Sequence, residues 1–182
     1  MAKQKKQNSA DYYLQQICPA GSTLYYSLLY QPDQARETMI LIEAFYQAIY
    51  QIIYKVSEPA IAKVKLQWWH EEVSRMFSQT ANHPITKRLQ AHTQTFNLNQ
   101  GYFSEIINGV TDYLNNPALD NNQAAYTFYC RTAGSRELLK ASILKKITPE
   151  LIKPIYQAAS GIAIAEDFSF ATKALNQPLT LA

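Results

Sequence analysis

Three tyrosines share one face of a long apolar segment in the first half of the chain. Tyr46, Tyr50 and Tyr54 are spaced four residues apart, so they lie one above the other if the segment is a helix. Phenol rings at this spacing can stack, and their hydroxyls can form hydrogen bonds. A phenol with a pKa of about 10 is not an anionic metal ligand at neutral pH. The pattern therefore favours packing of the rings over metal chemistry.

Two tryptophans and two lysines follow in the next apolar segment. Trp68 and Trp69 are adjacent, and aromatic residues at helical spacing usually fill a core. Lys63 and Lys65 could reach a phosphate group, although lysines on a solvated helix face are common. These four residues do not assign a site on their own.

The histidines and cysteines do not form a recognisable reactive group. His70, His83 and His92 lack the spacing and the shared face of a metal triad, so we expect structural or surface roles. Cys130 has no helical histidine neighbour to activate its thiol, so we interpret it as a small buried apolar residue. Cys18 and Cys130 are too few for a disulfide framework, which favours a reducing compartment.

The segments that carry these residues are predicted to be helices. The chain has 182 residues, of which 47% are hydrophobic and only 5 are glycine. Alternating runs of β-branched residues are scarce, so the chain lacks both the strands and the turns of a sheet. We therefore expect an all-α fold, with one domain over residues 9–182 and a basic flexible tail at residues 1–8.

Helical periodicity and capping residues divide the domain into helices. Asp33 is a candidate N-cap for the most apolar segment, which is predicted to be central to the core. Ser57 is a candidate N-cap for the next segment, with Pro59 in its first turn. Pro154 is expected to kink the last helix. The predicted helical segments are residues 9–19, 21–32, 33–56, 57–77, 83–96, 99–116, 121–146 and 148–168.

Charge and hydropathy argue against two classes of function. The formal net charge is +3, and Lys3, Lys5 and Lys6 lie in the tail, so the rest of the chain offers no footprint for nucleic acid. No apolar segment follows the basic start, and no run of about 18 apolar residues occurs, so we expect neither a signal peptide nor a membrane span. We expect a cytoplasmic protein, and peripheral contact with a membrane stays open.

Three ordered patches carry a resemblance to a known enzyme family. The first pattern is a helix with Lys-Leu-x-Trp-Trp-Arg-x-Glu, followed downstream by His-Pro. Residues 57–85 match this pattern, except that His70 stands in place of the arginine. The matching residues are Lys65, Leu66, Trp68, Trp69, Glu72, His83 and Pro84. The pattern Tyr-Cys-x-x-Ala-Gly-x-Val-Gly-x-Leu is matched by Tyr129, Cys130, Ala133 and Gly134. Residues 21–45 are similar to a serine-containing aromatic stretch that precedes a long helix. With these residues the chain resembles the squalene/phytoene synthase family.

The resemblance implies the isoprenoid synthase fold, an all-α bundle around a deep apolar cavity. Enzymes of this family join two prenyl diphosphates head to head, and two aspartate-rich motifs on facing helices hold the magnesium ions that bind the diphosphates. The first motif reads Phe-Cys-Arg-x-x-Asp-Asp-Ile-Val-Asp. This chain has Gln47 in the arginine position and, in the three aspartate positions, Tyr50, Gln51 and Tyr54. We therefore expect no metal cradle there.

The second motif also departs from the family pattern. Gly161 and Ala163 fit, but the glutamine, the asparagine and the two acids of the motif are replaced by Ala165, Phe168, Thr172 and Asn176. Glu166 and Asp167 are acidic but out of register, and Glu137 takes the place of a glycine in the Tyr-Cys pattern. The chain ends at Ala182, before the closing helices of full-length members, so we expect an incomplete domain with uncovered apolar faces and a tendency to self-associate.

Two hypotheses of different classes follow from the resemblance. In the first, the chain is catalytically inactive, without a metal or cofactor, and binds a protein partner or an apolar isoprenoid-like ligand. Residues 55–69 resemble the branch of the family that assembles respiratory complex I, whose first motif is likewise eroded. In the second, the chain is a prenyl transferase that uses Mg²⁺ to make a squalene- or phytoene-like product, completed by a partner chain. The family-equivalent positions of a ligand pocket are Tyr46, Tyr50, Tyr54, Trp68, Trp69, Tyr129, Cys130 and Gly134.

Overall fold

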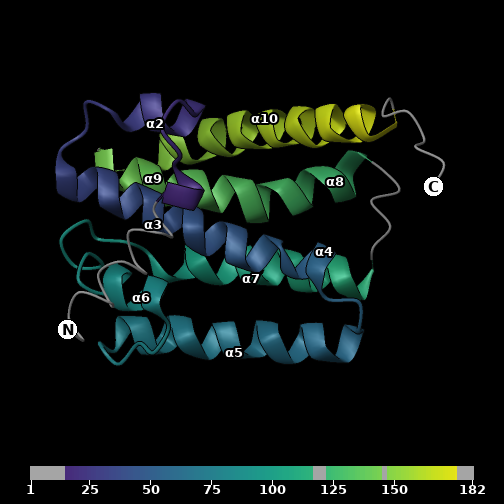
Figure 1. Ribbon diagram of the computed structural model, residues 1–182, viewed down its shortest axis with the longest axis horizontal. Helices are drawn as coiled ribbons and strands as arrows, with labels where there is room; N and C mark the ends of the chain where they lie inside the picture. Colours follow the sequence, from purple (N-terminus) through teal and green to yellow (C-terminus); the bar gives the residue numbers. More distant parts are fainter. Residues whose placement is uncertain (1–14, 117–121, 145–146, 176–182) are drawn as a thin grey trace.

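The described part of the protein is built from helices that pack in layers (Figure 1). The computed structural model describes residues 15–116, 122–144 and 147–175, without the side chains of residues 168–175. The predicted tail at residues 1–8 and the motif residue Asn176 are outside these ranges. The helices are α2 (Thr23–Leu28), α3 (Asp33–Tyr50), α4 (Ile52–Lys55), α5 (Pro59–Phe77), α6 (Pro84–Leu89), α7 (Gln100–Asn115), α8 (Asn122–Tyr129), the π-helix η1 (Cys130–Gly134), α9 (Ser135–Leu144) and α10 (Pro149–Leu175). The all-α prediction is confirmed.

Helix α3 is central to the core because apolar residues cover most of its circumference. Ile42, Phe45 and Ile49 are fully buried. The ring of Phe45 packs edge-on against Trp69 of α5 and Phe103 of α7, with ring centroids 5.4 Å and 5.1 Å apart. Such edge-to-face pairs stabilise a core beyond the area that they bury. Helix α3 therefore joins the α5 and α7 layer to the helices on its other side.

Helix α3 starts one residue earlier, and helix α5 one residue later, than a cap at the predicted residue would place them. Pro32 occupies the N-cap position of α3, so Asp33 is the first helical residue instead of the cap. Glu58, and not Ser57, occupies the N-cap position of α5. The reason is Pro59, whose ring pushes the preceding residue out of the helical region; Glu58 accordingly has φ −93° and ψ 115°. The prediction of Pro59 in the first turn is confirmed.

Helices α8 and α9 are continuous through the π-helix η1. The wider turn of a π-helix is rare and often lies at functional sites. Helices α7 and α10 both pack on η1. Two glycines make this possible: a Cβ atom on Gly109 of α7 would lie 2.7 Å from Thr132, and one on Gly134 would lie 2.2 Å from the ring of Tyr156 in α10.

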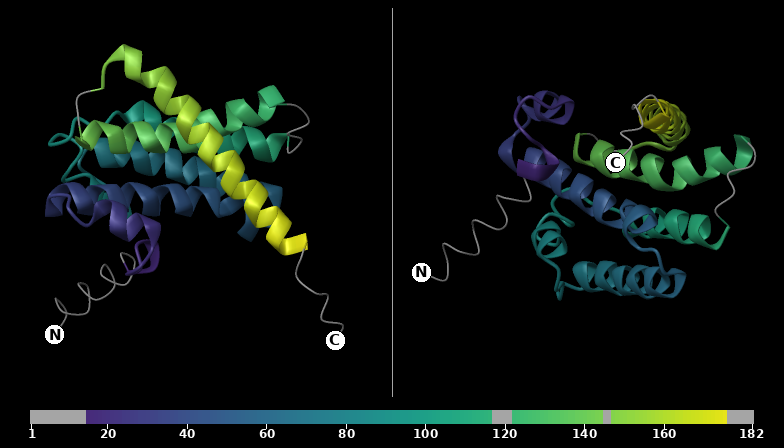
Figure 2. Two further views of the ribbon diagram at one scale, coloured as in Figure 1. Left: turned by 90° about the horizontal axis from the view of Figure 1, so that it is seen from above. Right: turned by 45° about the vertical axis from the view of Figure 1, so that its right-hand side comes forward.

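Helix α10 crosses the other helices on the side opposite to α5 (Figures 1 and 2). It begins at Pro149, because the backbone N–H that proline lacks has no partner within the first turn of a helix. It continues through Pro154 to Leu175 as one element. It packs on η1, α9 and α8. Within the described residues, no helix is long and apolar enough to span a membrane.

Candidate functional site

The tyrosine stripe runs from the core to the surface along α3 and α4. Tyr46 is buried, Tyr50 is half-buried, and Tyr54 is 69% exposed. The rings of Tyr46 and Tyr50 are stacked, with centroids 5.3 Å apart and an interplanar angle of 22°. The ring centroid of Tyr50 is also 5.9 Å from that of Tyr54 and 6.1 Å from that of Phe128 in α8. The spacing of four residues thus brings the rings together as helical geometry requires.

Asp167 of α10 connects this stripe to η1. The hydroxyl of Tyr50 donates to Asp167 Oδ2 over 2.8 Å. The hydroxyl of Tyr129, which immediately precedes η1, donates to the same oxygen over 2.8 Å. Hydrogen bonds to an ionised acceptor are stronger than those between neutral groups. One carboxylate oxygen therefore holds three separate segments of the chain together.

The phenols of this site stay protonated at neutral pH. Burial raises the pKa of Tyr46, Tyr50 and Tyr129 well above the usual value for a phenol. For Tyr50 the neighbouring Tyr46 and the hydrogen bond to Asp167 raise it further. A neutral phenol can donate a hydrogen bond to a carboxylate, but it is a poor ligand for a hard divalent cation.

The donor set at this place does not fit magnesium. Magnesium needs several oxygen ligands, usually one or two carboxylates together with phosphate and water oxygens. The family's three aspartate positions hold Tyr50, Gln51 and Tyr54, none of which is an acid. Asp167 already accepts two phenol hydroxyls through one oxygen. Among the described residues, no three His, Cys, Asp or Glu side chains gather where they could hold a metal ion.

A cluster of ion pairs adjoins the stripe on the side of α9. Glu43 of α3 contacts Arg136 over 3.3 Å and Lys140 over 2.8 Å, and Glu137 contacts the same two cations over 2.8 Å and 3.0 Å. Burial alone would raise the pKa of Glu43, but Lys140 and Arg136 hold it below its usual value. The Arg136 guanidinium also lies 4.4 Å from the ring centroid of Tyr46. Both cations are therefore already engaged by acids of this chain.

Cys130 and Gly134 face α10, and Cys130 is half-buried, not fully buried as predicted. The Sγ atom of Cys130 lies 3.2 Å from Ser160 Oγ, within hydrogen-bond range. Because Gly134 has no Cβ atom, the ring of Tyr156 can pack directly against its backbone. Within the described residues, neither of the two forms a hydrogen bond with Tyr46, Tyr50 or Tyr54.

Trp68 and Trp69 lie on the other side of α3, with α5. Trp69 is buried, and its ring centroid is 5.1 Å from that of Trp68 and 4.8 Å from that of His83. His83 is the N-cap of α6, where its Nδ1 accepts from the backbone N–H of Ile85 over 3.3 Å. This capping contact confirms a structural role for His83.

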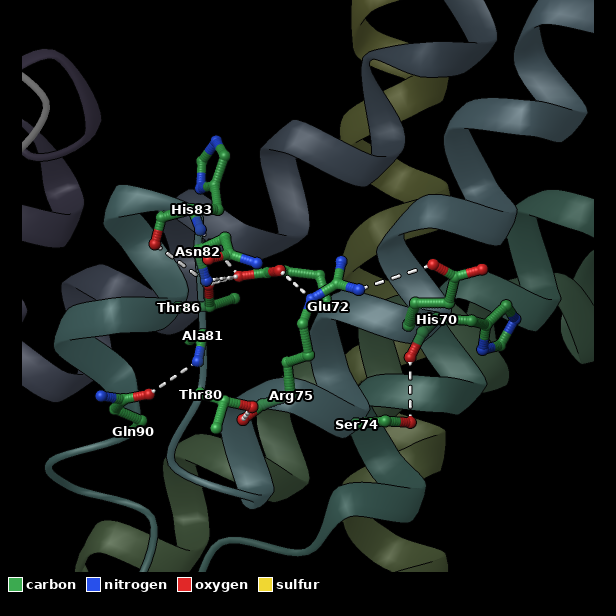
Figure 3. Close-up of polar contacts among 11 residues, drawn as sticks. His70, Glu72, Ser74, Arg75, Thr80, Ala81, Asn82, His83, Thr86 and Gln90 are labelled. Carbon is green, nitrogen blue, oxygen red and sulfur yellow. Dashed lines mark hydrogen bonds and ion pairs between the residues drawn. The ribbon is translucent and has the colours of Figure 1, made fainter.

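Glu72 is the anchor of this second region (Figure 3). Its fully buried carboxylate accepts hydrogen bonds from the backbone N–H groups of Asn82 and His83, each over 2.7 Å, and from the Thr86 hydroxyl. Arg75 Nε donates to its other oxygen over 2.9 Å. Burial alone would raise the pKa of Glu72, but these four donors lower it to about 2. The residues of the best-matched sequence patch thus fasten the loop after α5 to the start of α6.

A groove of about 480 Å³ lies between α4 and α5. Apolar residues form most of its wall, and Lys55 and Lys65 are among the residues that line it. The complete lining is Ala48, Gln51, Ile52, Lys55, Val56, Val64, Lys65, Trp68, Trp69 and His83. Because none of the stripe tyrosines lines this groove, the predicted pocket residues fall into separate places.

The described residues place the predicted pocket residues in two regions. Tyr46, Tyr50 and Tyr129 are brought together around Asp167, whereas the two tryptophans line the α4–α5 groove. The family motif does not select Asp167, because this residue is out of register with the acids of the motif. Asp167 does share a helical face with the residues of α10 that pack on η1. Tyr156, Ser160, Ala163 and Asp167 recur every three to four residues, and the first two contact η1. Whether these positions bind a ligand stays a prediction.

Comparison with known proteins identifies the family of this chain. The family model described as squalene/phytoene synthase matches residues 19–146. The fold is similar to a solved structure described as a dehydrosqualene synthase in complex with ligand, with a TM-score of 0.75 and 13% sequence identity. That similarity covers 90% of this chain and 56% of the other, so this chain spans about half of its length. None of the curated proteins compared matches the chain.

The solved structure shows the shared fold, since its sequence identity is low. The family model covers well over half of the chain, and the residues that it matches include the Glu72 anchor and most of the helices that surround the tyrosine stripe. The resemblance of the three sequence patches is thereby confirmed. The protein belongs to the squalene/phytoene synthase family.

Proposed function

We propose that this chain is a squalene/phytoene synthase-like protein without prenyl transfer activity, which acts by binding an apolar isoprenoid-like ligand or by assembling with a protein partner. The hydrogen bonds of Tyr50 and Tyr129 to Asp167 support the proposal most directly. Ionisation of a prenyl diphosphate needs divalent cations that neutralise the leaving group. Neutral phenols and one engaged carboxylate do not supply the anionic oxygens that would hold them.

The charges near the site support the same conclusion. Arg136 and Lys140 are the cations beside the stripe, and both pair with Glu43 and Glu137. A diphosphate would have to displace these partly buried acids to reach either cation, which leaves buried charges without partners. The residues that remain most similar to the family, around Glu72, hold helices together.

Diphosphate release tests the proposal. The full chain is incubated with farnesyl or geranylgeranyl diphosphate and Mg²⁺, and released inorganic diphosphate is measured against a control without protein. A dehydrosqualene synthase assayed in parallel shows that the conditions permit catalysis. We expect no release above the control. Release that needs both this protein and Mg²⁺ would establish the prenyl transferase hypothesis in its place.

A further inference from the structure

Three apolar side chains project from α5 as an exposed ridge. Ile61, Val64 and Trp68 follow one another at helical spacing, and they are 45%, 70% and 38% exposed. Val64 and Trp68 line both the α4–α5 groove and a second hollow beside α7, so they stand between two depressions. We call these three residues the α5 ridge. Figure 1 shows α5 along the lower edge of the bundle, with no helix below it.

Lysines flank the α5 ridge on both sides. Lys55 and Lys65 line the groove on one side, and Lys63 lines the second hollow on the other. All three are exposed, and Lys55 donates to the neutral amide of Gln51 over 2.8 Å. In the described part of the chain, the acidic residue among those lining the two hollows is Glu71, which pairs with Arg75 over 3.5 Å. The ridge is therefore apolar at its crest, and the two hollows on its flanks carry three lysines and one acid, Glu71, while the exposed Glu58 lies beyond Ile61 at the start of α5.

This combination fits a lipid surface better than a protein. The cores of protein interfaces are depleted in lysine, because burying an ammonium group is costly. At a membrane, by contrast, a lysine keeps its charge among the headgroups while aliphatic and tryptophan side chains enter the boundary with the acyl chains. An anionic leaflet adds attraction for each lysine near it.

We propose that the α5 ridge binds the surface of a membrane that contains anionic lipids, with Val64 and Trp68 in the headgroup region and Lys55, Lys63 and Lys65 against the lipid anions. The contact is peripheral and reversible. It uses the face of α5 that points away from the tyrosine stripe. It does not depend on whether the protein binds or converts a prenyl diphosphate.

Vesicle flotation tests this proposal with the full chain. Vesicles of phosphatidylcholine alone are compared with vesicles that contain about one third phosphatidylserine. We expect binding to the anionic vesicles and little to the neutral ones. The double variant Lys63→Gln/Lys65→Gln should weaken binding about fivefold per lysine, and thus about 25-fold in total. Val64→Gln, at the most exposed position of the ridge, should weaken binding without unfolding the protein.

Matched variants separate the ridge from general charge. Lys87→Gln/Lys153→Gln removes the same charge from two exposed lysines of α6 and α10, and we expect it to bind as the unchanged protein does. A second control replaces the tail residues Lys3, Lys5 and Lys6 by glutamine. Absence of binding to anionic vesicles would overturn the proposal. So would an equal loss of binding in either control, or retained binding in Lys63→Gln/Lys65→Gln. Diphosphate release is measured without vesicles, so the two proposals fail independently.

Discussion

Glu72 and Asp167 both collect hydrogen-bond donors, but they differ in what surrounds them. Glu72 is fully buried and accepts from two backbone N–H groups, a hydroxyl and a guanidinium. Its four donors make the ionised form stable in spite of burial. Asp167 is half-buried and accepts from two phenols. At the scale of residues, the first acid fixes a loop, and the second connects α10 to α3 and to the segment before η1.

Loss of the Glu72 charge should destabilise the protein. Glu72→Gln removes an anion from four donors and places an amide N–H₂ among them, so we expect a loss of about 3 kcal/mol in the free energy of unfolding at pH 7. Urea denaturation measures it. Glu71→Gln is the matched control, because its exposed pair with Arg75 should contribute less than about 0.5 kcal/mol. Equal effects of the two variants would contradict the anchoring role of Glu72.

The same carboxylate predicts a dependence of stability on pH. The pKa of Glu72 is lowered from 4.5 to about 2 on folding, so its contribution is complete above the unfolded value. It is lost as the pH falls from about 4.5 toward about 2. The difference in unfolding free energy between the unchanged protein and Glu72→Gln should therefore shrink over this range. Denaturation at a series of pH values tests this, and a constant difference would argue against it.

The two phenol donors to Asp167 should act as a pair. Tyr50→Phe or Tyr129→Phe removes one donor and leaves the other, so each should cost about 1 kcal/mol of unfolding free energy. The double variant leaves Asp167 without either donor and should cost more than the sum of the single variants. Urea denaturation of the four proteins gives this coupling. Tyr30→Phe, at a residue 91% exposed, serves as the control.

At the scale of elements, packing against the π-helix η1 fixes the position of α10. Helices α7 and α10 both pack on η1, and the glycines Gly109 and Gly134 permit the close approach. The hydrogen bond from Tyr129 to Asp167 and the contact of Cys130 with Ser160 both join this part of the chain to α10. A change that pushes α10 away from η1 should therefore disturb the Asp167 site as well.

Two glycine substitutions test this packing. Gly134→Ala would place its Cβ 2.2 Å from the Tyr156 ring, so we expect a loss of at least about 2 kcal/mol in unfolding free energy. Gly161→Ala in the middle of α10 meets nothing within 4 Å and should stabilise the helix by about 0.8 kcal/mol. Thermal and urea denaturation compare the two. A neutral Gly134→Ala variant would show that α10 is not held closely against η1.

The sequence predicts the helices well and their joints less well. Apolar periodicity locates α3, α5, α7 and α10, and Pro59 marks the start of α5. It does not predict η1, because a π turn changes the spacing only locally and carries no distinct residue pattern. The Asp167 site was missed because its partners, Tyr50 and Tyr129, are distant in the chain. Residues so far apart come together only through packing that periodicity does not specify.

At the scale of the whole molecule, the family pattern is preserved in some places and lost in others. The matched residues Trp69, Glu72 and His83 form contacts that join α5 to α6 and to the core. Of the three aspartate positions of the family's first motif, Tyr50 donates to Asp167 of α10, and Gln51 lines the α4–α5 groove. The contacts that hold the bundle together therefore do not depend on the aspartates of the family's first motif. The predicted self-association stays a prediction.

Thermal stability should not respond to magnesium. A ligand at 100 times its dissociation constant stabilises the folded state by about 2.7 kcal/mol, which raises the melting temperature measurably. We expect no such rise with Mg²⁺ alone, and no additional rise when Mg²⁺ is added to farnesyl diphosphate. Differential scanning fluorimetry compares the four conditions. A rise that needs Mg²⁺ and diphosphate together would indicate a metal-bridged site.

The separation of Tyr50 and Asp167 in the chain has a consequence for biosynthesis. The two residues are 117 positions apart, whereas Glu72 and its partners at residues 82–86 are only 10 to 14 positions apart. A ribosome that adds roughly 5–20 residues per second needs on the order of ten seconds between the two. The α5–α6 junction can therefore form on the nascent chain while the face of α3 that carries Tyr46 and Tyr50 is still open. During that interval the aromatic rings of this face lack their cover by α10 and are available to a chaperone.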